Sequence, residues 1–439
     1  MIGFELAEDQ VAAQKWAREF AEKEIRPVAP GYDETEDFPW PVVKKAAEVG
    51  LYGMDFYRMV GEDDSGILQP LIVEELCWGC AGISLAIFGS GLPLVALMAS
   101  GTPDQVATWA PRMFGTPDDP KVAAFAVTEP GAGSDVSSLR TRAVRDGGDW
   151  VLNGQKVFIT NGGIADVHVV VATVDPSLGH RGQASFLVPP GTPGLRQGKK
   201  ERKLGIRASH TAEVLLEDCR LPADCLLGGE ERLNAKLGAA RSPEAREARL
   251  PEAREARLPE AREATLPEAR EATLPEAREA RNKDQRRTSS GALKTFEATR
   301  PIVAAQAVGI ARAAFEFARD YARERTQFGK PIAAQQAIAF KLADMATEID
   351  AARLLVWRAS WMARNGAPFA HAEGSMSKLK AGEVAVRVTD EAIQVLGGYG
   401  YIRDFPVEKW HRDSKIYCLF EGTSEIQRLV ISRANGGMA

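Results

Sequence analysis

The chain has 439 residues, 45% of them hydrophobic and 26% charged, and its formal net charge is −5. A chain this long can bury a large core, which predicts about three domains that need neither disulfides nor metals for stability. The slightly acidic charge argues against a general nucleic-acid binder or a polybasic membrane binder. Its five cysteines, an odd number, predict no disulfide framework and favour a reducing, cytoplasmic location.

Residues 1–120 predict a helical domain, because apolar residues recur at helical spacing between clusters of glycine and proline. The first nine residues are acidic, so they lack the basic region and apolar run of a secretory signal.

One stretch of this domain, residues 76–103, carries no charge and is long enough to cross a bilayer. However, Pro93 and five glycines interrupt it, and Glu74 and Glu75 flank it. We therefore expect two buried helical pieces that break around residues 91–93, in a soluble protein without a membrane span.

A β-rich domain is predicted over residues 121–235, because short apolar runs separated by turn residues are typical of a barrel or sandwich. The dipeptide Asn153-Gly154 lies between two of these runs, and both residues tolerate the positive φ of a tight hairpin turn. The strand candidates are residues 122–128, 150–152, 156–160, 167–172, 185–188 and 213–216.

Residues 242–281 are five copies of an octapeptide rich in Glu, Ala and Arg. Every copy contains a proline, which removes a backbone donor and restricts the residue before it. Each copy has at most one leucine, so the repeat has no core to bury. We expect residues 236–290 to form a solvated, mobile excursion of kinked short helices or disorder, with a docking arm as the functional alternative.

The helical period returns in residues 291–439. Positions 338, 342, 345, 349, 352 and 356 are apolar and step by four and three, which predicts the seam of a long packed helix. Together the three patterns predict an α+β multidomain chain, in which an N-terminal helical domain, a middle β-barrel and a C-terminal helical bundle follow one another.

The segment Val-Thr-Glu-Pro-Gly-Ala-Gly-Ser-Asp at residues 127–135 follows a predicted strand. Gly131 and Gly133 let the backbone approach a ligand, and Thr128 and Ser134 offer hydroxyl groups. Since neither a third glycine nor a helix follows, the dinucleotide fingerprint is absent. Taken alone, a glycine turn between strands is the commoner explanation.

Glu421 is the strongest candidate for a catalytic group. It follows the apolar run 417–420 and precedes a helix start, since Ser424 and Gln427 have capping-box spacing. A carboxylate beside apolar residues has a raised pKa, which suits a general base. A solvated glutamate before a helix is the commoner explanation of such a residue taken alone.

Other motifs give weaker signals. Arg325, at the end of a predicted helix, suits either a phosphate clamp or the helix dipole. Cys77 and Cys80 have no second pair at zinc-site spacing, and the five histidines are scattered, so no metal site is predicted.

In combination and in order, these motifs resemble the acyl-CoA dehydrogenases. The similarity runs from about residue 4 to 435, leaving out the octapeptide repeat. The matching segments are 127–135, 153–156, 159–162, 204–207, 299–301, 323–330, 394–400 and 421–428.

The resemblance implies a homotetramer with a four-helix C-terminal bundle, and FAD between the β-domain and the bundle. The residues implied to bind FAD in the same subunit are Phe125, Ala126, Val127, Thr128, Gly133, Ser134, Phe158, Ile159, Thr160, Thr423 and Glu425. Those implied to reach a neighbouring subunit's FAD are Arg325, Gln327, Phe328, Gln336, Gln394, Val395, Leu396, Gly397 and Gly398. Positions near the acyl-CoA are matched by Ser134, Glu297, Arg300 and Gly422.

Glu421 matches the family's base, which removes the α-proton of an acyl-CoA thioester while the β-hydride passes to flavin N5. Members with the base elsewhere place a glutamate immediately before the arginine of a central helix, where this chain has Thr299. Three departures from the family stand out: Phe158 replaces a common Trp, Glu297 replaces a common Asp, and the octapeptide repeat is inserted.

The implied function is therefore α,β-dehydrogenation of an acyl-CoA to trans-2-enoyl-CoA, with electrons passing to an electron-transferring flavoprotein. Two alternatives stay open, an acyl-CoA oxidase that uses oxygen and a non-enzymatic, DNA-binding flavoprotein of the same fold. The acidic charge and the lack of a basic tail disfavour nucleic acid as a partner.

Overall fold

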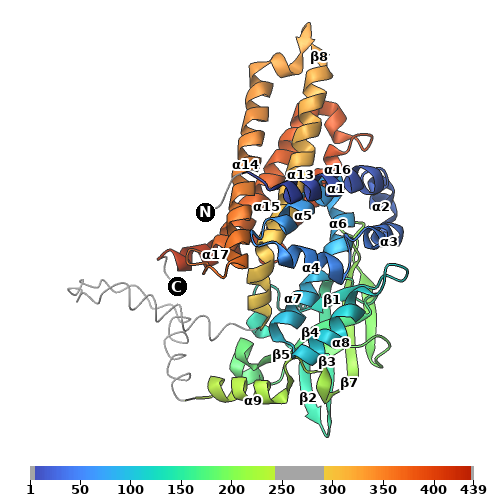
Figure 1. The fold of residues 1–439 in the computed structure, drawn as a ribbon, viewed down its shortest axis with the longest axis vertical. Coiled ribbons are helices and arrows are strands. Elements are labelled where there is room, and N and C mark those ends of the chain that lie inside the picture. Colours follow the sequence, from blue (N-terminus) through green and yellow to red (C-terminus); the bar gives the residue numbers. More distant parts are fainter. Residues whose placement is uncertain (1–4, 243–290, 437–439) are drawn as a thin grey trace, which may run out of the picture.

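The structure is a computed structural model that describes residues 5–242 and 291–436, with only the backbone described for 291–298. Almost all of the octapeptide repeat, for which mobility is predicted, lies outside the described residues. The described chain follows the predicted order of helical, β and helical parts (Figure 1).

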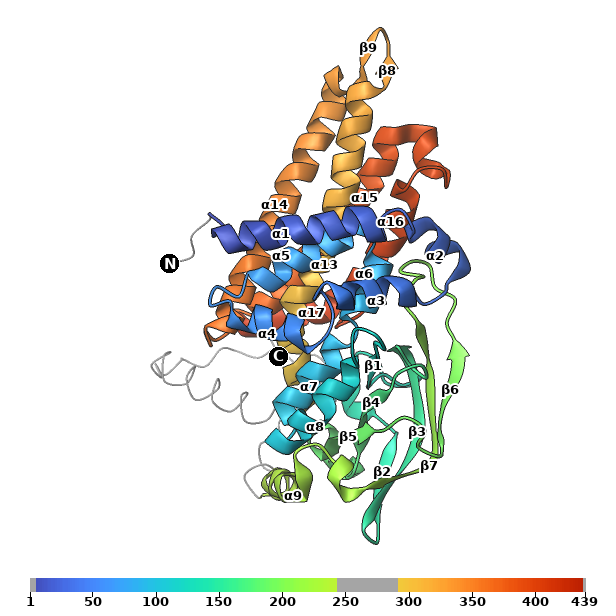
Figure 2. The same cartoon turned by 45° about the vertical axis from the view of Figure 1, so that its right-hand side comes forward.

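The N-terminal part consists of short helices that lie across the long C-terminal helices (Figure 2). The break predicted near residues 91–93 falls slightly earlier, at Gly89 and Ser90 between α6 and α7. Helix α8 begins with a capping box, in which Thr102 and Gln105 each bind the other's backbone N–H. The helices are α1 (Glu8–Phe20), α2 (Ala29–Thr35), α3 (Trp40–Glu48), α4 (Met54–Glu62), α5 (Leu68–Gly79), α6 (Ala81–Phe88), α7 (Gly91–Ser100) and α8 (Pro103–Phe114), with a π-helical turn at Ala21–Ile25.

Two helical segments of the described chain, Ala81–Ser100 and Thr299–Glu324, are long and apolar enough to cross a bilayer. About two thirds or more of each apolar window, 67% and 72%, is buried inside the protein. Length and composition of this kind are also found in core helices.

The β-domain is a curled sheet of seven strands in the order β1-β4-β2-β3-β7-β6, with β5 paired to β4. Strands β2 and β6 were not predicted. The strands are β1 (Ala123–Ala126), β2 (Arg142–Asp146), β3 (Asp149–Thr160), β4 (Val167–Thr173), β5 (Gln183–Val188), β6 (Leu195–Lys200) and β7 (Thr211–Pro222), and helix α9 (Gly229–Ala240) follows.

The hairpin predicted at Asn153-Gly154 is wrong, because β3 runs straight through these residues. The turn lies at Gly147 and Gly148, which join paired strands β2 and β3. Asn153 instead bonds across to Asp218 on β7, beside a bulge in the β3–β7 pairing. The dipeptide therefore marks a bulge, which also favours glycine.

The C-terminal bundle is built on three long helices that pack against one another and on α5. The predicted seam is buried at Met345, Ile349, Ala352 and Val356 of α14, while its first two members are only half-buried. The elements are α13 (Gly291–Glu324), α14 (Gln336–Arg364), α15 (Glu373–Leu396), a 3₁₀ turn at Gly397–Tyr401, α16 (Val407–Ser414), a 3₁₀ turn at Lys415–Cys418 and α17 (Ser424–Ala434).

A short hairpin joins α13 to α14 at the far tip of the bundle (Figure 1). Its strands are β8 (Thr326–Gln327) and β9 (Lys330–Pro331), and the turn residues Phe328 and Gly329 have φ of 54° and 76°. Two successive positive φ values are typical of the turns that close two-residue hairpins.

Buried charges join the two helical parts. Glu74 and Glu75 of α5 are both nearly inaccessible to solvent. Arg312 of α13 lies 3.1 Å from Glu74, and Arg353 of α14 lies 2.8 Å from the same carboxylate. Because a buried charge is costly without a partner, these pairs fix how α5 sits on the bundle.

Candidate active site

Glu421 lies in a tight loop directly before α17. Its φ is 55° and that of Gly422 is 90°, so the chain takes two left-handed residues in succession. The helix cap differs from the prediction by one residue, because Thr423 rather than Ser424 is the N-cap, and its hydroxyl accepts from the N–H of Ile426 at 3.3 Å.

The carbonyl groups of this loop are held by two buried side chains. Nε2 of Gln427 donates to the carbonyls of Glu421 and Gly422, each at 3.0 Å. Nζ of Lys378, on α15, donates to the Gly422 carbonyl at 2.6 Å. A Cβ at position 422 would lie 2.6 Å from Gln427 Nε2 and would displace this donor, and the φ of 90° itself favours glycine.

The carboxyl group of Glu421 accepts a hydrogen bond from the Thr299 hydroxyl, with 3.0 Å between Oγ1 and Oε2. Burial raises the pKa of Glu421 to about 7, and the Thr299 bond and the charges of Arg300 and Lys378 limit this rise. A carboxyl group with a pKa near neutrality is suited to exchange a proton with a substrate.

Lys378 is a member of this site that the sequence analysis missed. Its side chain is buried, and burial lowers the pKa of its ammonium group to about 8. It lies on a face of α15 whose other members are small and buried: Gly374, Ser375, Ser377, Ala381 and Gly382. The sequence signal that could have indicated a buried Lys378 was a single lysine among small residues at helical spacing.

Two of the four residues predicted to lie near the acyl-CoA, Arg300 and Gly422, meet at this end of α13. Arg300 is buried and donates from Nη1 to the Ser375 hydroxyl at 3.0 Å. Gly422 adjoins Glu421. The side chain of Glu297 lies outside the described residues, and Ser134 lies exposed on the β-domain loop.

A buried ion pair holds the loop 127–135 against β3. Nζ of Lys156 lies 2.8 Å from Glu129 Oε1 and also donates to the Val127 carbonyl at 2.8 Å. The Glu129 carboxylate accepts from the N–H groups of Arg140 and Thr141, at 2.6 and 2.9 Å. Burial opposes its charge, but Lys156 and these bonds lower the pKa of Glu129 below its ordinary value.

The residues predicted to line a flavin lie on both faces of the sheet. Phe125 and Val127 pack in the core shared with the helices, whereas Ala126 and Ile159 pack in the interior of the β-domain. The latter two can therefore meet a ligand only through their backbone. Phe158 has φ of 58° and is 66% exposed. Thr128 and Thr160 are half-buried, and Gly133 is exposed.

A cavity of about 530 Å³ adjoins the Glu421 loop between α15, α16 and α17. The predicted cofactor residue Glu425 lines it, whereas Thr423 does not. The other residues that line it are Glu383, Val386, Arg387, Asp390, His411, Lys415, Cys418, Leu419 and Ser424.

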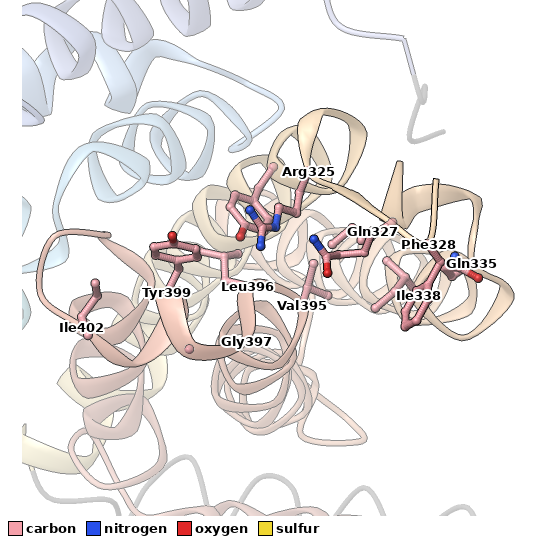
Figure 3. A pocket seen from close by; sticks show the side chains of 13 residues that line it. Arg325, Gln327, Phe328, Gln335, Ile338, Val395, Leu396, Gly397, Tyr399 and Ile402 are labelled. Carbon is pink, nitrogen blue, oxygen red and sulfur yellow. The ribbon is translucent and has the colours of Figure 1, made fainter. Parts of the chain in front are cut away.

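A second cavity, of about 550 Å³, lies at the tip of the bundle (Figure 3). It brings together seven of the nine residues predicted to reach a neighbouring subunit's cofactor: Arg325, Gln327, Phe328, Val395, Leu396, Gly397 and Gly398. Gln336 and Gln394 are adjacent in sequence to lining residues and are exposed. Arg325 sits 5.7 Å from the Tyr399 ring centroid, and Phe328 is 94% exposed.

Within one chain, the residues around Glu421 lie far from those predicted to reach a neighbouring subunit's FAD. Thr299, which binds Glu421, lies near the start of α13, and Arg325 directly follows its end. At about 1.5 Å per helical residue, the intervening helix separates them by roughly 40 Å. Figure 1 shows the hairpin tip at the end of the bundle opposite the β-domain.

Within the described residues, no group of three or more His, Cys, Asp or Glu side chains could hold a metal ion.

Three sequence models of one family match the chain in order. They are the acyl-CoA dehydrogenase N-terminal domain over residues 7–116, the middle domain over 124–219 and the C-terminal domain over 290–435. The chain belongs to the acyl-CoA dehydrogenase family. The family resemblance and the helical, β and helical order predicted from the sequence are thereby confirmed, and this acyl-CoA dehydrogenase is an oxidoreductase.

Named relatives agree with this assignment. The mitochondrial short-chain specific acyl-CoA dehydrogenase of Bos taurus is 39% identical over 436 residues, covering 98% of this chain and 90% of the relative. Butyryl-CoA dehydrogenase from Megasphaera elsdenii has a TM-score of 0.79 at 33% identity, over 99% of this chain and 100% of that one. A chain described with the electron transferring flavoprotein of Acidaminococcus fermentans has a TM-score of 0.79 at 34% identity, over 99% and 100%.

Proposed function

We propose that this acyl-CoA dehydrogenase removes the α- and β-hydrogens of a short-chain acyl-CoA to give the trans-2-enoyl-CoA, with Glu421 as the base. The observation that carries the proposal is the Glu421 carboxyl group, whose pKa is raised to about 7 and which Thr299 orients at 3.0 Å. The short-chain preference follows the Bos taurus and Megasphaera elsdenii relatives.

The residues present fit FAD as the cofactor. Phe158 offers an exposed aromatic ring, and the half-buried Thr128 and Thr160 offer hydroxyl groups. The cavity that Glu425 lines also includes Leu419 and Ser424, which lie on either side of the Glu421 loop. FAD, when bound, supplies the acceptor for the β-hydride at flavin N5.

The chain's own part in the reaction is proton transfer and orientation. Glu421 takes the α-proton of the thioester, and its ionised form is the active one. The Glu421 backbone N–H would polarise the thioester oxygen, because its loop is fixed through the carbonyls that Gln427 and Lys378 bind. Arg300 lies beside the carboxyl group and favours its charged form.

A complete site requires a second subunit. Arg325 and its neighbours at the tip cavity lie roughly 40 Å along α13 from the Glu421 end, too far to share one FAD with it in the same chain. We propose that they hold the adenosine and pyrophosphate of a neighbouring subunit's FAD in a homotetramer. The exposed Phe328 at the tip is consistent with such a contact.

Electrons are proposed to leave to an electron-transferring flavoprotein, by analogy with the Acidaminococcus fermentans structure. The oxidase alternative would instead pass them to oxygen. No observation in the described residues favours a nucleic-acid partner.

Anaerobic mixing with acyl-CoA substrates of different length tests the proposal. Butyryl-CoA should bleach the flavin absorbance of the wild-type enzyme within milliseconds to seconds. Glu421→Gln should bind the substrate but lose bleaching by a factor of about 10³ or more, whereas Glu391→Gln, which removes a carboxylate of α15 that pairs with Lys341 of α14, should be unaffected. Bleaching that persists in Glu421→Gln contradicts the assignment of the base. Oxygen consumption without an added acceptor would identify an oxidase.

A further inference from the structure

The carboxylate of Asp413 lies where three parts of the chain meet, outside the proposed flavin and acyl-CoA sites. Asp413 is on the last turn of α16 and is fully buried. Its Oδ1 accepts from the backbone N–H of Ile206, in the β-domain, at 2.5 Å. Its Oδ2 accepts from Nζ of Lys409 at 2.5 Å, and the same Nζ lies 3.3 Å from Sγ of Cys80, between α5 and α6. One buried carboxylate therefore joins the β-domain to α16 and, through Lys409, to the N-terminal helices.

Segment 204–207 of the β-domain fits closely against α16. A Cβ at Gly205 would lie 2.3 Å from the carbonyl oxygen of Arg412, so a side chain there would push the two backbones apart. Nη1 of Arg412 donates to the Leu204 carbonyl at 3.2 Å. The φ of Ile206 is 46°, a left-handed conformation that is unfavourable for a β-branched residue. Such a conformation persists only where the surroundings fix it, and the bond to Asp413 is a contact of this kind.

On the β-domain side, this segment leads into the strand that holds predicted flavin residues. The carbonyl of His210 accepts from the N–H of Asn161 at 3.0 Å, and β7 begins at the next residue. The first two residues of β7 pair with Thr160 and Ile159, at the end of β3. A displacement of Ile206 would therefore carry over to the end of β3 that is proposed to line the flavin.

On the other side, α16 leads to the loop that carries the proposed base. Asp413 lies eight positions before Glu421, and the 3₁₀ turn Lys415–Cys418 connects α16 to that loop. The hydroxyl of Tyr417, in this turn, donates to Oε1 of Gln306 on α13 at 3.1 Å. A short turn held in this way cannot absorb a displacement of α16 by bending, so the displacement would reach Glu421.

We propose that Asp413 is a positioning residue, which sets the spacing between the Glu421 carboxyl group and the flavin-lining end of β3 by holding the Ile206 N–H. This role rests on the proposed function, since it takes the two elements to act on one substrate. Because the reaction depends steeply on the placement of the reacting groups, a small displacement slows flavin reduction more than it weakens substrate binding. An ion pair that only stabilises α16 would need Lys409 but not Ile206.

Two double variants of the holoenzyme separate these roles, because both delete the buried charges and only one keeps an acceptor for Ile206. Asp413→Asn/Lys409→Met retains an oxygen that can accept, whereas Asp413→Leu/Lys409→Met places a methyl group there. With saturating FAD and butyryl-CoA, the first should bleach within about threefold of the wild-type rate and the second about tenfold more slowly. The KM for butyryl-CoA should stay within about twofold of wild type in both.

FAD binding gives a measurement that does not depend on turnover. The Asp413→Leu/Lys409→Met variant should bind FAD about tenfold more weakly and change the visible circular dichroism of the bound flavin, whereas the Asp413→Asn/Lys409→Met variant should match wild type. Equal bleaching rates and FAD affinities in the two double variants would overturn the role of Asp413. A wild-type holoenzyme that bleaches with no acyl-CoA would instead contradict the proposed function, and the FAD affinities would still decide the role of Asp413.

Gly205→Ala tests the same contact from the β-domain side, and it serves if a double variant does not fold. Its methyl group would meet the Arg412 carbonyl and displace segment 204–207, so bleaching should slow by about tenfold with little change in KM. Gly148→Ala is the matched control, because a Cβ there meets no atom within 4 Å, and it should behave as wild type. A wild-type bleaching rate and FAD affinity in Gly205→Ala would also overturn the proposal.

Discussion

Thr299 and Glu421 lie 122 positions apart in the sequence, yet the hydroxyl group of one donates to the carboxyl group of the other at 3.0 Å. One belongs to α13 and the other to the loop before α17, so the bond joins two elements of the bundle. It is the interaction that opposes the effect of burial on the Glu421 pKa most strongly.

The proposed base makes the reaction depend on pH in a defined direction. Burial raises the pKa of Glu421 to about 7, so a growing fraction of the enzyme is protonated and inactive as pH falls below that value. We expect kcat/KM to fall by about tenfold per pH unit well below pH 7 and to level off above pH 8. Steady-state assays from pH 5.5 to 9 measure this, and a flat profile would contradict the role of Glu421.

Removal of the Thr299 hydroxyl should move the fall of kcat/KM at low pH to higher pH. Thr299→Val deletes a bond to the charged form of Glu421, so the apparent pKa should rise by roughly one unit, equivalent to about 1.4 kcal/mol. Activity should fall several-fold at pH 6.5 and little at pH 9. Thr347→Val removes a hydroxyl that bonds a carbonyl of its own helix, and it should leave the profile unchanged.

Lys378 should act as a positioning residue. Lys378→Met removes the 2.6 Å bond to the Gly422 carbonyl and a positive charge near Glu421. We expect kcat to fall by about tenfold and the loss of activity at low pH to begin at a higher pH, with little change in butyryl-CoA affinity. Lys380→Met, two positions away and paired with Glu348 at the surface, is the control. If the activity of the two variants fell over the same pH range, Lys378 would have a structural role only.

The buried pair Glu129–Lys156 should dominate the local stability of the β-domain. Glu129→Gln leaves the Lys156 ammonium without its carboxylate, and loss of one partner of a buried pair costs about 3–5 kcal/mol. Because the pKa of Glu129 is lowered on folding, this contribution is present above its ordinary pKa and is lost as pH falls through the lowered value.

Urea unfolding at pH 7 measures this loss. Glu217→Gln removes the partner of an exposed pair with Arg196, and it should cost less than about 1 kcal/mol. The double variant Glu129→Gln/Lys156→Met should recover part of the lost stability, since it removes the unpaired charge. No recovery would show that the carboxylate matters through its bonds to Arg140 and Thr141 instead.

The shared site can be tested by complementation. Glu421→Gln and Arg325→Ala homo-oligomers should each have low activity, the second through loss of FAD. In oligomers assembled from both variants, some sites combine an intact Glu421 with an intact Arg325 from the neighbouring subunit. We expect activity of the mixture above that of either variant. Activity no higher than the average of the two would place both residues in the site of one chain.

The sequence indicated much of the fold, because helical and strand periodicity records which side chains are buried. The seam from Met345 to Val356 is an example. The prediction of a hairpin at Asn153-Gly154 failed, because a bulge and a hairpin turn both favour residues that accept unusual backbone angles. The distinction depends on the pairing partner, here Asp218 on β7.

The candidate site was only partly predictable for a similar reason. The apolar run before Glu421 indicated a raised pKa, but the partners Thr299 and Lys378 come from other helices. The capping residue was misplaced by one position, because Thr423 and Ser424 are equally able to cap and only the backbone conformation decides between them.

One consequence of the length of α13 concerns mixtures of normal and altered copies. Because its two ends would serve different flavins, damage at the hairpin tip would harm the adjacent copy rather than its own. A gene product altered at Arg325 would then impair wild-type partners in the same assembly, and its effect in a cell that makes both would be dominant. An alteration confined to Glu421 would disable only its own active centre and leave its partners' centres working.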